Sequence, residues 1–493
     1  MAWYYLQIEA QNFDDFILDT DDLSTRRGAS FQLLHAIGAV GKELTSKFPG
    51  KVTIIQEAAS VGLYRLELAD ETAARSAEKI ARAAATKIAS HATFGVACGP
   101  VSGVSAQAFA EDRQHLLARL RWDQMQSLSL MVPAWNSSTS KGPCSFDMVR
   151  PAVKDDWKGG EKRPVSEAVF ERRQYGKREK HDFYKHETES SAHPIGDAVS
   201  FVSDLDDLTE SSAAKNLSHK MALIYVDGNG FGQKYNQAVA AAAGRDPWDA
   251  YRAESDSLLG ERRKMLAALL QKMAGDSGWR NGNAYRIETL LWGGDEILWV
   301  VPAWKAWETL QHFFDHASSW TIGVQPVTHA AGVVFCHHTA PIHRMIDLVH
   351  GLCEAAKDTS RKENLIAFQV LESFDFTAKD LGGFRKALIP GHDKELILRA
   401  DAMAQVPAVF PKLKEVVPRK KVYRAAQAAH EQGKDAKEIF EEIDRSAHPL
   451  NSDLPALRAC LGQADEVFWY HVRELWDYIP TLGNYSAGSG VAS

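Results

Sequence analysis

Apolar and polar positions alternate along two short runs of the chain, Tyr285–Trp292 and Ile297–Pro302, which predicts two β-strands. The residues between these runs are Gly293, Gly294, Asp295 and Glu296. A short glycine-containing turn between two such runs is typical of a β-hairpin. The two glycines leave no side chain over the turn, so a ligand can approach the backbone closely. The pattern predicts a hairpin with two carboxylates at its tip, although on this motif alone an ordinary turn with solvated acids is an equally good interpretation.

A continuous apolar run, Ala222–Val226, predicts a buried strand. The run ends at Asp227, and the glycine-rich segment that follows leads into a predicted helix over Gln233–Ala243. That segment consists of Gly228, Asn229, Gly230, Phe231 and Gly232. A strand, a glycine-rich turn and a helix in this order bind phosphate groups, because free backbone N–H groups and the positive end of the helix dipole face the ligand. The Gly-x-Gly-x-Gly spacing differs from the dinucleotide-binding Gly-x-Gly-x-x-Gly.

The carboxylate of Asp227 would repel a triphosphate unless a divalent cation lay between them. Mg²⁺ prefers one or two carboxylates together with phosphate oxygens and water. We therefore predict that Asp227 and Asp295 lie on neighbouring strands and hold Mg²⁺ or Mn²⁺ on a nucleoside triphosphate.

These two motifs resemble the catalytic palm of GGDEF-type nucleotidyl cyclases. They resemble still more closely the palm of the large polymerase/cyclase subunit of type III CRISPR effector complexes, which often carries Asp-Gly-Asp-x-x-Gly and Gly-Gly-Asp-Asp. A third match is the segment His329–His343, a predicted strand, loop and helix start, followed by Ala-Ala-Lys ending at Lys357. The sequence departs from this pattern at Asn229, where many relatives have a second acid. It also departs at Glu296, where it agrees with the GGDEF enzymes.

The resemblance implies roles for individual residues. Asp227, Asp295 and Glu296 would be the catalytic residues and metal ligands, with the Gly228 carbonyl as a further ligand. The nucleotide-binding set that the resemblance implies contains Gly228, Asn229, Gly230, Phe231, Gly232, Gly293, Gly294, Lys357 and Ser30. Within it, Lys357 and the glycine-rich turn would hold the phosphates. Ser30, with Arg26 or Arg27, would contact a second nucleotide between two palms.

The predicted fold class is α+β, with two ferredoxin-like palm domains of which the first is degenerate. The first third of the chain reads β-α-β-β-α-β, which is the ferredoxin-like order, but it has no acidic turn motif. In this first palm Ser30 is predicted to cap a helix over Phe31–Lys47. The predicted domains are a first palm (residues 1–135), an irregular charged linker (136–215), a catalytic palm (216–375) and a helical domain with a disordered tail (376–493).

Two features of the predicted linker and its surroundings have alternative interpretations. The basic segment 171–180 is either a solvated charged helix or a contact for RNA or a partner, and the acids of residues 14–22 are predicted to lie in a solvated loop. The segment around Cys144 resembles a zinc-ribbon remnant, but one cysteine does not make a tetrahedral zinc site. His337, His338 and His343 span a strand end and a helix start, so their side chains need not converge, and we predict no metal there.

Composition narrows the class of protein. The chain has 493 residues, 45% hydrophobic and 25% charged, which are ordinary globular values. The net charge of −7 argues against general coating of nucleic acid. Five scattered cysteines indicate neither a disulfide framework nor a Cys-x-x-Cys site. No apolar run approaches the ~20 residues of a membrane span, so we expect a cytoplasmic protein without a membrane partner.

The predicted function is a nucleotidyltransferase that converts nucleoside triphosphates, ATP foremost, into cyclic or short oligonucleotide second messengers in antiviral defence. The partners implied are an RNA or protein activator and either effector-complex subunits or a second copy of the chain. One alternative is a catalytically silent nucleotide-binding scaffold of an RNA-guided defence complex, which Asn229 and the degenerate first palm favour. Another is a GTP-using cyclic dinucleotide synthase, for which the guanine-selecting residues have no clear match, Asn236 being off register.

Overall fold

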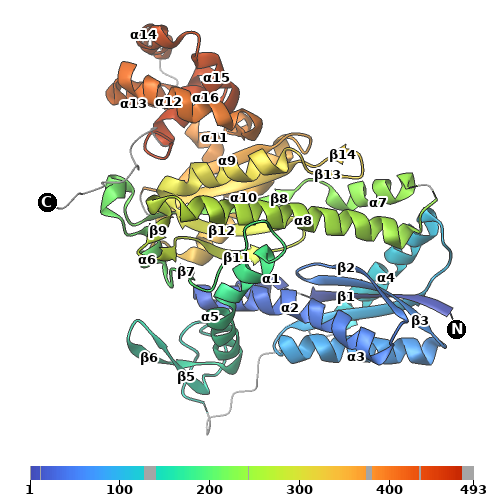
Figure 1. Ribbon diagram of the computed structural model, residues 1–493. Helices are drawn as coiled ribbons and strands as arrows, with labels where there is room; N and C mark the ends of the chain where they lie inside the picture. The colour runs from blue at the N-terminus through green and yellow to red at the C-terminus, as the bar shows by residue number, and fades with distance from the viewer. Residues whose placement is uncertain are drawn as a thin grey trace.

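The first sheet is formed by the N-terminal part of the chain. The computed structural model describes residues 2–11, 13–126, 140–242, 244–372, 380–431 and 435–479. Four antiparallel strands lie in the order β2-β3-β1-β4; they are β1 (Ala2–Gln11), β2 (Val52–Glu57), β3 (Val61–Leu68) and β4 (Thr93–Pro100). Helices α2 (Leu23–Lys47) and α3 (Glu71–Ile88) make the two crossovers (Figure 1). This is the ferredoxin-like arrangement, so the predicted fold of the first palm is confirmed.

The second sheet repeats this topology and extends it. Its first four strands lie in the order β11-β12-β8-β15, and β16 and β17 continue the sheet beyond β15. These strands are β8 (Lys220–Gly228), β11 (Glu288–Trp292), β12 (Glu296–Pro302), β15 (His329–His337), β16 (Leu365–Val370) and β17 (Leu398–Arg399). The helices around it are α7 (Phe231–Ala241), α8 (Pro247–Ala274), α9 (Ala306–Ala317) and α10 (Ile342–Thr359). The α+β class with two ferredoxin-like units is therefore confirmed.

The apolar run of β8 is continuous because both faces of the strand are buried. Ala222, Ile224 and Val226 belong to a core that includes residues of α8 and α9. Leu223 and Tyr225 belong to a second core, formed with α10. Since side chains alternate between the faces of a strand, a sheet covered on both sides needs apolar residues at consecutive positions.

The remaining elements connect and cover the two sheets (Figure 1). Helix α1 (Phe13–Ile17) lies between β1 and α2 in the chain, and α4 (Ala106–Gln126) follows β4 and packs on it. The segment that connects the two palms contains β5 (Lys154–Lys158), β6 (Glu161–Val165), α5 (Glu167–Thr188), β7 (Ser200–Phe201) and α6 (Leu205–Thr209). Short strands β9 (Arg280–Asn281), β10 (Ala284–Tyr285), β13 (Thr321–Ile322) and β14 (Gln325–Pro326) line the second palm. Cys144 is buried in a small core with Val165 and Val169, as expected of a packing residue.

The C-terminal part is helical, and its aromatic residues are core. Its helices are α11 (Leu381–Leu388), α12 (Val406–Val416), α13 (Arg419–Glu431), α14 (Ala436–Ala447), α15 (Leu454–Leu461) and α16 (Asp465–Glu474). Within this region, which was predicted to be helical, Leu398 instead forms a strand, because it pairs with Ile366 and completes the edge of the second sheet. The tail predicted to be disordered, residues 483–493, lies outside the described residues. The described part has no helix long and apolar enough to cross a membrane.

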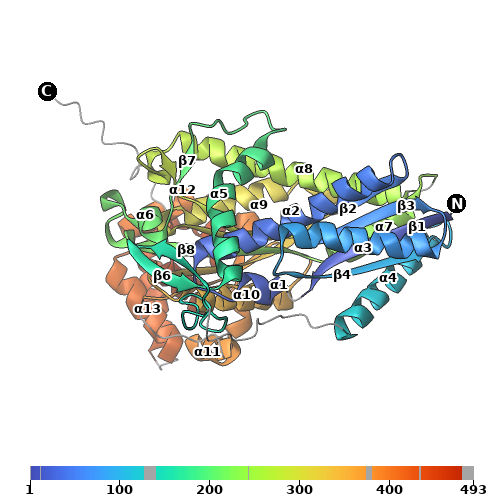
Figure 2. The same cartoon turned by 90° about the horizontal axis from the view of Figure 1, so that it is seen from below.

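Helix α5 lies across α2 at a contact between two glycines (Figure 2). A Cβ atom on Gly28 would lie 1.7 Å from the carbonyl oxygen of Arg172, and one on Gly176 would lie 2.0 Å from the carbonyl oxygen of Ser24. The backbones of the two helices therefore touch, and only glycine fits at either position.

The charged segment on α5 is largely buried, so the expectation of a solvated helix is wrong for this face. Arg172 donates to both carboxylate oxygens of Asp19, each at 2.8 Å. Arg173 donates to Asp22 at 3.0 Å. These two acids come from the segment predicted to be a solvated loop, and they face the arginines because the glycine contact brings α5 onto the start of α2.

The glycine contact predicts opposite effects of the same substitution at two positions of α2. Gly28→Ala should lower the free energy of unfolding by about 1–3 kcal/mol, because the methyl group must push two backbones apart. Gly38→Ala is the matched control, since nothing lies within 4 Å of a Cβ there; it should raise that free energy by about 0.5–1 kcal/mol. Urea unfolding followed by circular dichroism measures both, and equal effects at the two positions would contradict the proposed backbone contact.

Candidate functional site

The pairing of β12 with β8 brings the two acidic turns together. In the antiparallel register Glu296 lies opposite Asp227. The backbone N–H of Gly228 donates to the carbonyl oxygen of Asp295 at 3.1 Å. The prediction that the two motifs lie on neighbouring strands is confirmed. Two segments far apart in the sequence thus place three carboxylates at one end of the sheet.

The surroundings of Asp227 and Asp295 disfavour the ionised form of both carboxyl groups. Burial raises the pKa of the Asp227 carboxyl, the ammonium group of Lys357 opposes this rise, and the charge of Asp295 adds to it. Burial also raises the pKa of Asp295, against the opposing charges of Arg262 and Lys357. Each acid therefore lies in surroundings that disfavour its ionised form, and a bound divalent cation would relieve this cost. The donor set of partly buried carboxylates fits Mg²⁺ or Mn²⁺.

Lys357 reaches this end of the sheet from α10. Its ammonium group forms an ion pair with the Asp227 carboxylate and a second one with Glu354 at 3.1 Å. The sequence predicted that Lys357 would lie near phosphates bound at the acids, and its position beside Asp227 is compatible with that role. In the described structure it neutralises the acid.

Glu296 extends on the same face of the sheet as Asp227. It is engaged by the hydroxyl group of Tyr225, whose ring stacks on His350 with centroids 4.0 Å apart. Burial and the charge of Glu296 raise the pKa of Tyr225, so the tyrosine stays a hydrogen-bond donor. Glu296 is thereby oriented beside the acid pair, and its catalytic role stays a prediction.

The glycine-rich turn begins a helix earlier than predicted. Gly230 has φ of +67°, which favours glycine, and α7 starts at Phe231 rather than at Gln233. Gly228 cannot carry a Cβ, because that atom would lie 2.3 Å from the Phe231 ring. Gly230 and Gly232 have nothing within 4 Å of a Cβ, so the space over the turn is open. This geometry leaves the N-terminus of α7 accessible to a ligand.

Asn229 points away from that open space. It is buried, its backbone N–H donates to the carbonyl oxygen of Thr328 at 2.8 Å, and its Nδ2 donates to the Thr328 hydroxyl at 3.2 Å. These contacts fix the turn against the start of β15. A contact between Asn229 and nucleotide stays a prediction.

Arg262 on α8 holds the hairpin turn and was not predicted as a site residue. Its guanidinium group donates to the carbonyl oxygens of Gly293 and Gly294, and it lies over the Trp292 ring, 4.8 Å from the centroid. Arg262 shares a helical face with the buried Leu258 and Leu269, so a charge on an apolar face was the signal that could have identified it.

A cleft of about 1250 Å³ opens in front of the hairpin turn. One wall is α2 and the turn after β2, and the other is formed by α7, α8 and Gly293–Asp295. The two palms approach there turn to turn, since a Cβ on Gly293 would lie 3.8 Å from the Ala59 methyl group. The cleft is lined by basic side chains, including Lys42 and Arg263, and by acidic ones, including Glu57 and Asp295. Its size suits more than one nucleotide.

Ser30 does not start a helix, so the predicted cap is wrong. The helix α2 begins at Leu23, and Asp22 caps it by accepting from the backbone N–H of Thr25 at 3.0 Å. Ser30 is buried in the second turn and is not part of the cleft wall. Asp22 was not predicted as the cap, because the acids around it suggested a loop. A contact between Ser30 and a nucleotide stays a prediction.

The arginines beside Ser30 are structural. Arg27 and Lys180 both bind the buried carboxylate of Glu288, at 2.5 Å and 2.6 Å. Arg26 donates to the carbonyl oxygen of Thr20. Neither arginine is part of the cleft wall.

Comparison with known families gives the same assignment for the second palm. Residues 220–366 match the family model of the Cas10/Cmr2 second palm domain. The chain resembles the Cas10-like large subunit of type III CRISPR complexes. The matched segment contains Asp227, Asp295 and Lys357.

Several solved structures share the fold of this chain over 97% of its length. A Csm1–Csm4 cassette in complex with one ATP has a TM-score of 0.52 and 15% identity, over 97% of this chain and 70% of that chain. The cassette in complex with cA3 has a TM-score of 0.53 and 14% identity, over 97% and 69%. Csm1 of T.onnurineus has a TM-score of 0.51 and 15% identity, over 97% and 69%. A search of curated proteins found no match.

Replacing Asp295 in this Cas10-like palm should stabilise the fold, although it removes a predicted metal ligand. The raised pKa of Asp295 means that its ionised form costs folding free energy at neutral pH, and that this cost disappears as the pH falls through the folded-state pKa. Asp295→Asn should therefore raise the melting temperature of metal-free protein at pH 7 but not at pH 4. Asp227→Asn should give no comparable gain, because it leaves the buried Lys357 without its main partner. Thermal unfolding of the three proteins at both pH values tests this, and a destabilised Asp295→Asn at pH 7 would contradict it.

Proposed function

We propose that this protein is a divalent-metal-dependent nucleotidyltransferase that joins nucleoside triphosphates, ATP foremost, into cyclic or short linear oligonucleotides in antiviral defence. The observation that carries this proposal is the β12–β8 register, which brings the turn of Asp227 next to that of Asp295, and Asp295 lines a cleft large enough for two nucleotides. The match of residues 220–366 to a Cas10/Cmr2 palm supports it.

The reaction attaches a ribose hydroxyl of one nucleotide to the α-phosphorus of another. The new O–P bond forms as the bond from that phosphorus to pyrophosphate breaks, and the hydroxyl proton leaves to solvent or a nearby carboxylate. Asp227 and Asp295 would hold Mg²⁺ or Mn²⁺, with the Gly228 carbonyl as a further ligand. When bound, such a cation neutralises charge on the leaving group and favours loss of the hydroxyl proton.

The side chains around the acids position the substrates. Lys357 would contact phosphate oxygens next to Asp227, and the N–H groups at the start of α7 would bind the phosphate chain. Arg262 would fix the Gly293–Gly294 backbone, so that the hairpin turn keeps its position in the cleft wall. Glu296 would orient the attacking hydroxyl group or assist the metal ligands.

Adenine nucleotides are favoured over GTP. Crystal structures of the similar Csm1–Csm4 cassette contain one ATP or cA3. Asn236, the residue nearest in sequence to a guanine-selecting position, accepts a hydrogen bond from Arg113 of α4 at 3.3 Å. Its side chain is therefore committed to the first palm rather than to a base in the cleft.

The partners follow from the same comparison. The similar structures pair Csm1 with Csm4, so we infer that this chain is a cytoplasmic subunit that assembles with other proteins and responds to an RNA or protein activator. A second copy of the chain is an alternative partner.

The first test is loss of product on removal of the acids. Asp227→Asn and Asp295→Asn should each reduce product formation from ATP with Mg²⁺ or Mn²⁺ by roughly 100-fold or more. Asp358→Asn is the control, because this aspartate is exposed and lies next to Lys357 on α10. Mass spectrometry of products from a mixture of the four nucleoside triphosphates identifies base, linkage and ring size. Full product formation by the Asp227→Asn/Asp295→Asn protein would refute the proposal.

Replacing Lys357 tests whether its ammonium group binds the phosphates of ATP. Lys357→Met should raise the KM for ATP by roughly 10-fold or more, since it removes a charged hydrogen-bond donor to the phosphates. Lys362→Met, which removes an exposed lysine near the end of the same helix, should leave KM unchanged. Steady-state kinetics at several ATP concentrations measures both, and an unchanged KM in Lys357→Met would exclude the phosphate contact.

A catalytically silent scaffold is the second candidate, and the direction of Asn229 favours it. Residue 229 is Asn, so the motif supplies one acid where many relatives have two, and the Asn229 side chain binds Thr328. Calorimetry that shows ATP binding without turnover, in the presence of RNA and partner proteins, would identify the scaffold.

A further inference from the structure

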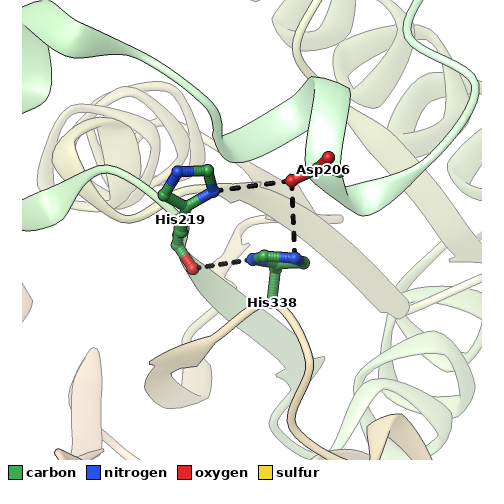
Figure 3. A group of neighbouring side chains, drawn as sticks. All are labelled: Asp206, His219 and His338. Atoms are coloured by element: carbon green, nitrogen blue, oxygen red, sulfur yellow. Dashed lines mark hydrogen bonds and ion pairs between the residues drawn. The ribbon is translucent and has the colours of Figure 1, made fainter.

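Three side chains with metal-binding atoms converge at the end of β8 that is opposite to the acid pair (Figure 3). Asp206 belongs to α6, His219 directly precedes β8, and His338 directly follows β15. Lys220 pairs with His337 in the β8–β15 register, so the two histidines next to that pair are neighbours. One ligand atom from each of the three residues lies within 4.8 Å of the other two.

The distances fit a shared cation better than hydrogen bonds. Nδ1 of His219 lies 3.4 Å from Oδ1 of Asp206, and Nε2 of His338 lies 3.5 Å from the same atom. An N–H···O hydrogen bond spans about 2.7–3.2 Å, so both separations are too long. Two ligand atoms about 2.0–2.1 Å from a tetrahedral zinc ion lie about 3.3–3.4 Å apart. The observed separations are close to that edge length.

The ring of His338 is oriented for ligation. Its Nδ1 donates to the carbonyl oxygen of His219 at 3.1 Å, and its backbone N–H donates to the same oxygen at 2.9 Å. With the proton on Nδ1, the lone pair of Nε2 faces Asp206. A histidine that ligates a metal ion usually donates its other ring N–H to a carbonyl or carboxylate oxygen in this way.

His219 presents a nitrogen atom that nothing else uses. Its Nδ1 is inaccessible to solvent and has no hydrogen-bond partner among the described residues. The backbone of His219 is held in place, because its N–H donates to the carbonyl oxygen of Thr209 at 2.9 Å and its φ is +63°. A residue in this left-handed conformation, with a fixed backbone and a buried free nitrogen, fits a ligand position.

We propose that Asp206, His219 and His338 bind one divalent transition-metal ion, Zn²⁺ foremost, with a water molecule in the fourth position. No metal was predicted at His338 from the sequence, because it was considered only with His337 and His343, which do not join the converging group. Imidazole nitrogen atoms suit Zn²⁺, whereas Mg²⁺ prefers oxygen ligands alone. The ion joins α6 and the chain before β8 to the end of the second sheet. The length of β8 places it about 25 Å from Asp227 at ~3.3 Å per residue, so the ion takes no direct part in nucleotidyl transfer. This site is independent of the proposed nucleotidyl transfer.

His337 provides a matched control at the same place. It lies next to His338, with ring centroids 4.5 Å apart, but its Nδ1 contacts the Thr339 hydroxyl oxygen at 2.8 Å. Its nitrogen atoms do not belong to the converging group. Replacing it removes an imidazole from the neighbourhood and leaves the three ligands in place.

The test is a Zn²⁺ titration of the full chain after removal of metals with a chelator. Calorimetry should show one Zn²⁺ bound per chain and thermal unfolding a higher melting temperature with Zn²⁺. Asp206→Ala and His338→Gln should each weaken binding at least tenfold and abolish the thermal shift, whereas His337→Gln and Asp227→Asn/Asp295→Asn should retain both. Mg²⁺ over the same concentrations should not compete.

Two outcomes would overturn the site. One is the absence of Zn²⁺ binding to the unmodified chain, and the other is equal binding by Asp206→Ala, His338→Gln and the control. Loss of Zn²⁺ binding in Asp206→Ala cannot be attributed to misfolding, because the Asp206 side chain is 64% exposed and its replacement leaves no cavity. Circular dichroism should confirm that each variant is folded, and the d–d absorption of bound Co²⁺ should vanish in His338→Gln but not in His337→Gln.

Discussion

The backbone pairing of β12 with β8 is the constraint on which the rest of the site depends. It sets Glu296 opposite Asp227 and places the Asp295 carbonyl oxygen against the Gly228 N–H. A slip of one residue would turn the acids to opposite faces, because side chains alternate along a strand. Such a slip would also exchange the side chains that fill the two cores, one on each face of the sheet. The packing of these cores thus fixes the position of charged groups that the cores do not contain.

A second constraint holds the two palms against each other. Glu288, next to the hairpin, is buried between Arg27 of the first palm and Lys180 of α5. Burial lowers the pKa of Lys180 to about 8, and the charge of Glu288 opposes that fall. Breaking a buried charge group by removing one member is costly, because the others remain desolvated. This cluster and the glycine contact of α2 with α5 give the cleft a fixed second wall.

The second palm sheet carries chemistry of different kinds at its two ends. At one end, burial raises the pKa values of Asp227 and Asp295, and Asp295 lines the cleft. At the other end, the proposed Asp206–His219–His338 site joins two strand ends to a short helix. The strands between them are apolar and rigid, so an ion at the second site would stabilise the sheet that positions the first.

The sequence by itself determined the elements and motifs that are local in the chain. The alternating runs, the Asp227 and Gly293–Glu296 turns and the strand order of the first palm could all be predicted, because each is encoded within a few neighbouring residues. The boundaries were less certain: Asp22 rather than Ser30 caps α2, and Leu398 forms a strand because the edge of a distant sheet needs a partner.

Only the tertiary structure decided which distant side chains meet. Arg262 of α8 binds the backbone of the hairpin turn, Arg172 binds Asp19, and His219 faces Asp206. Helix crossings and strand registers bring each of these pairs together. No spacing in the sequence contains this information, since a buried arginine and an exposed one have the same side chain and differ only in their surroundings.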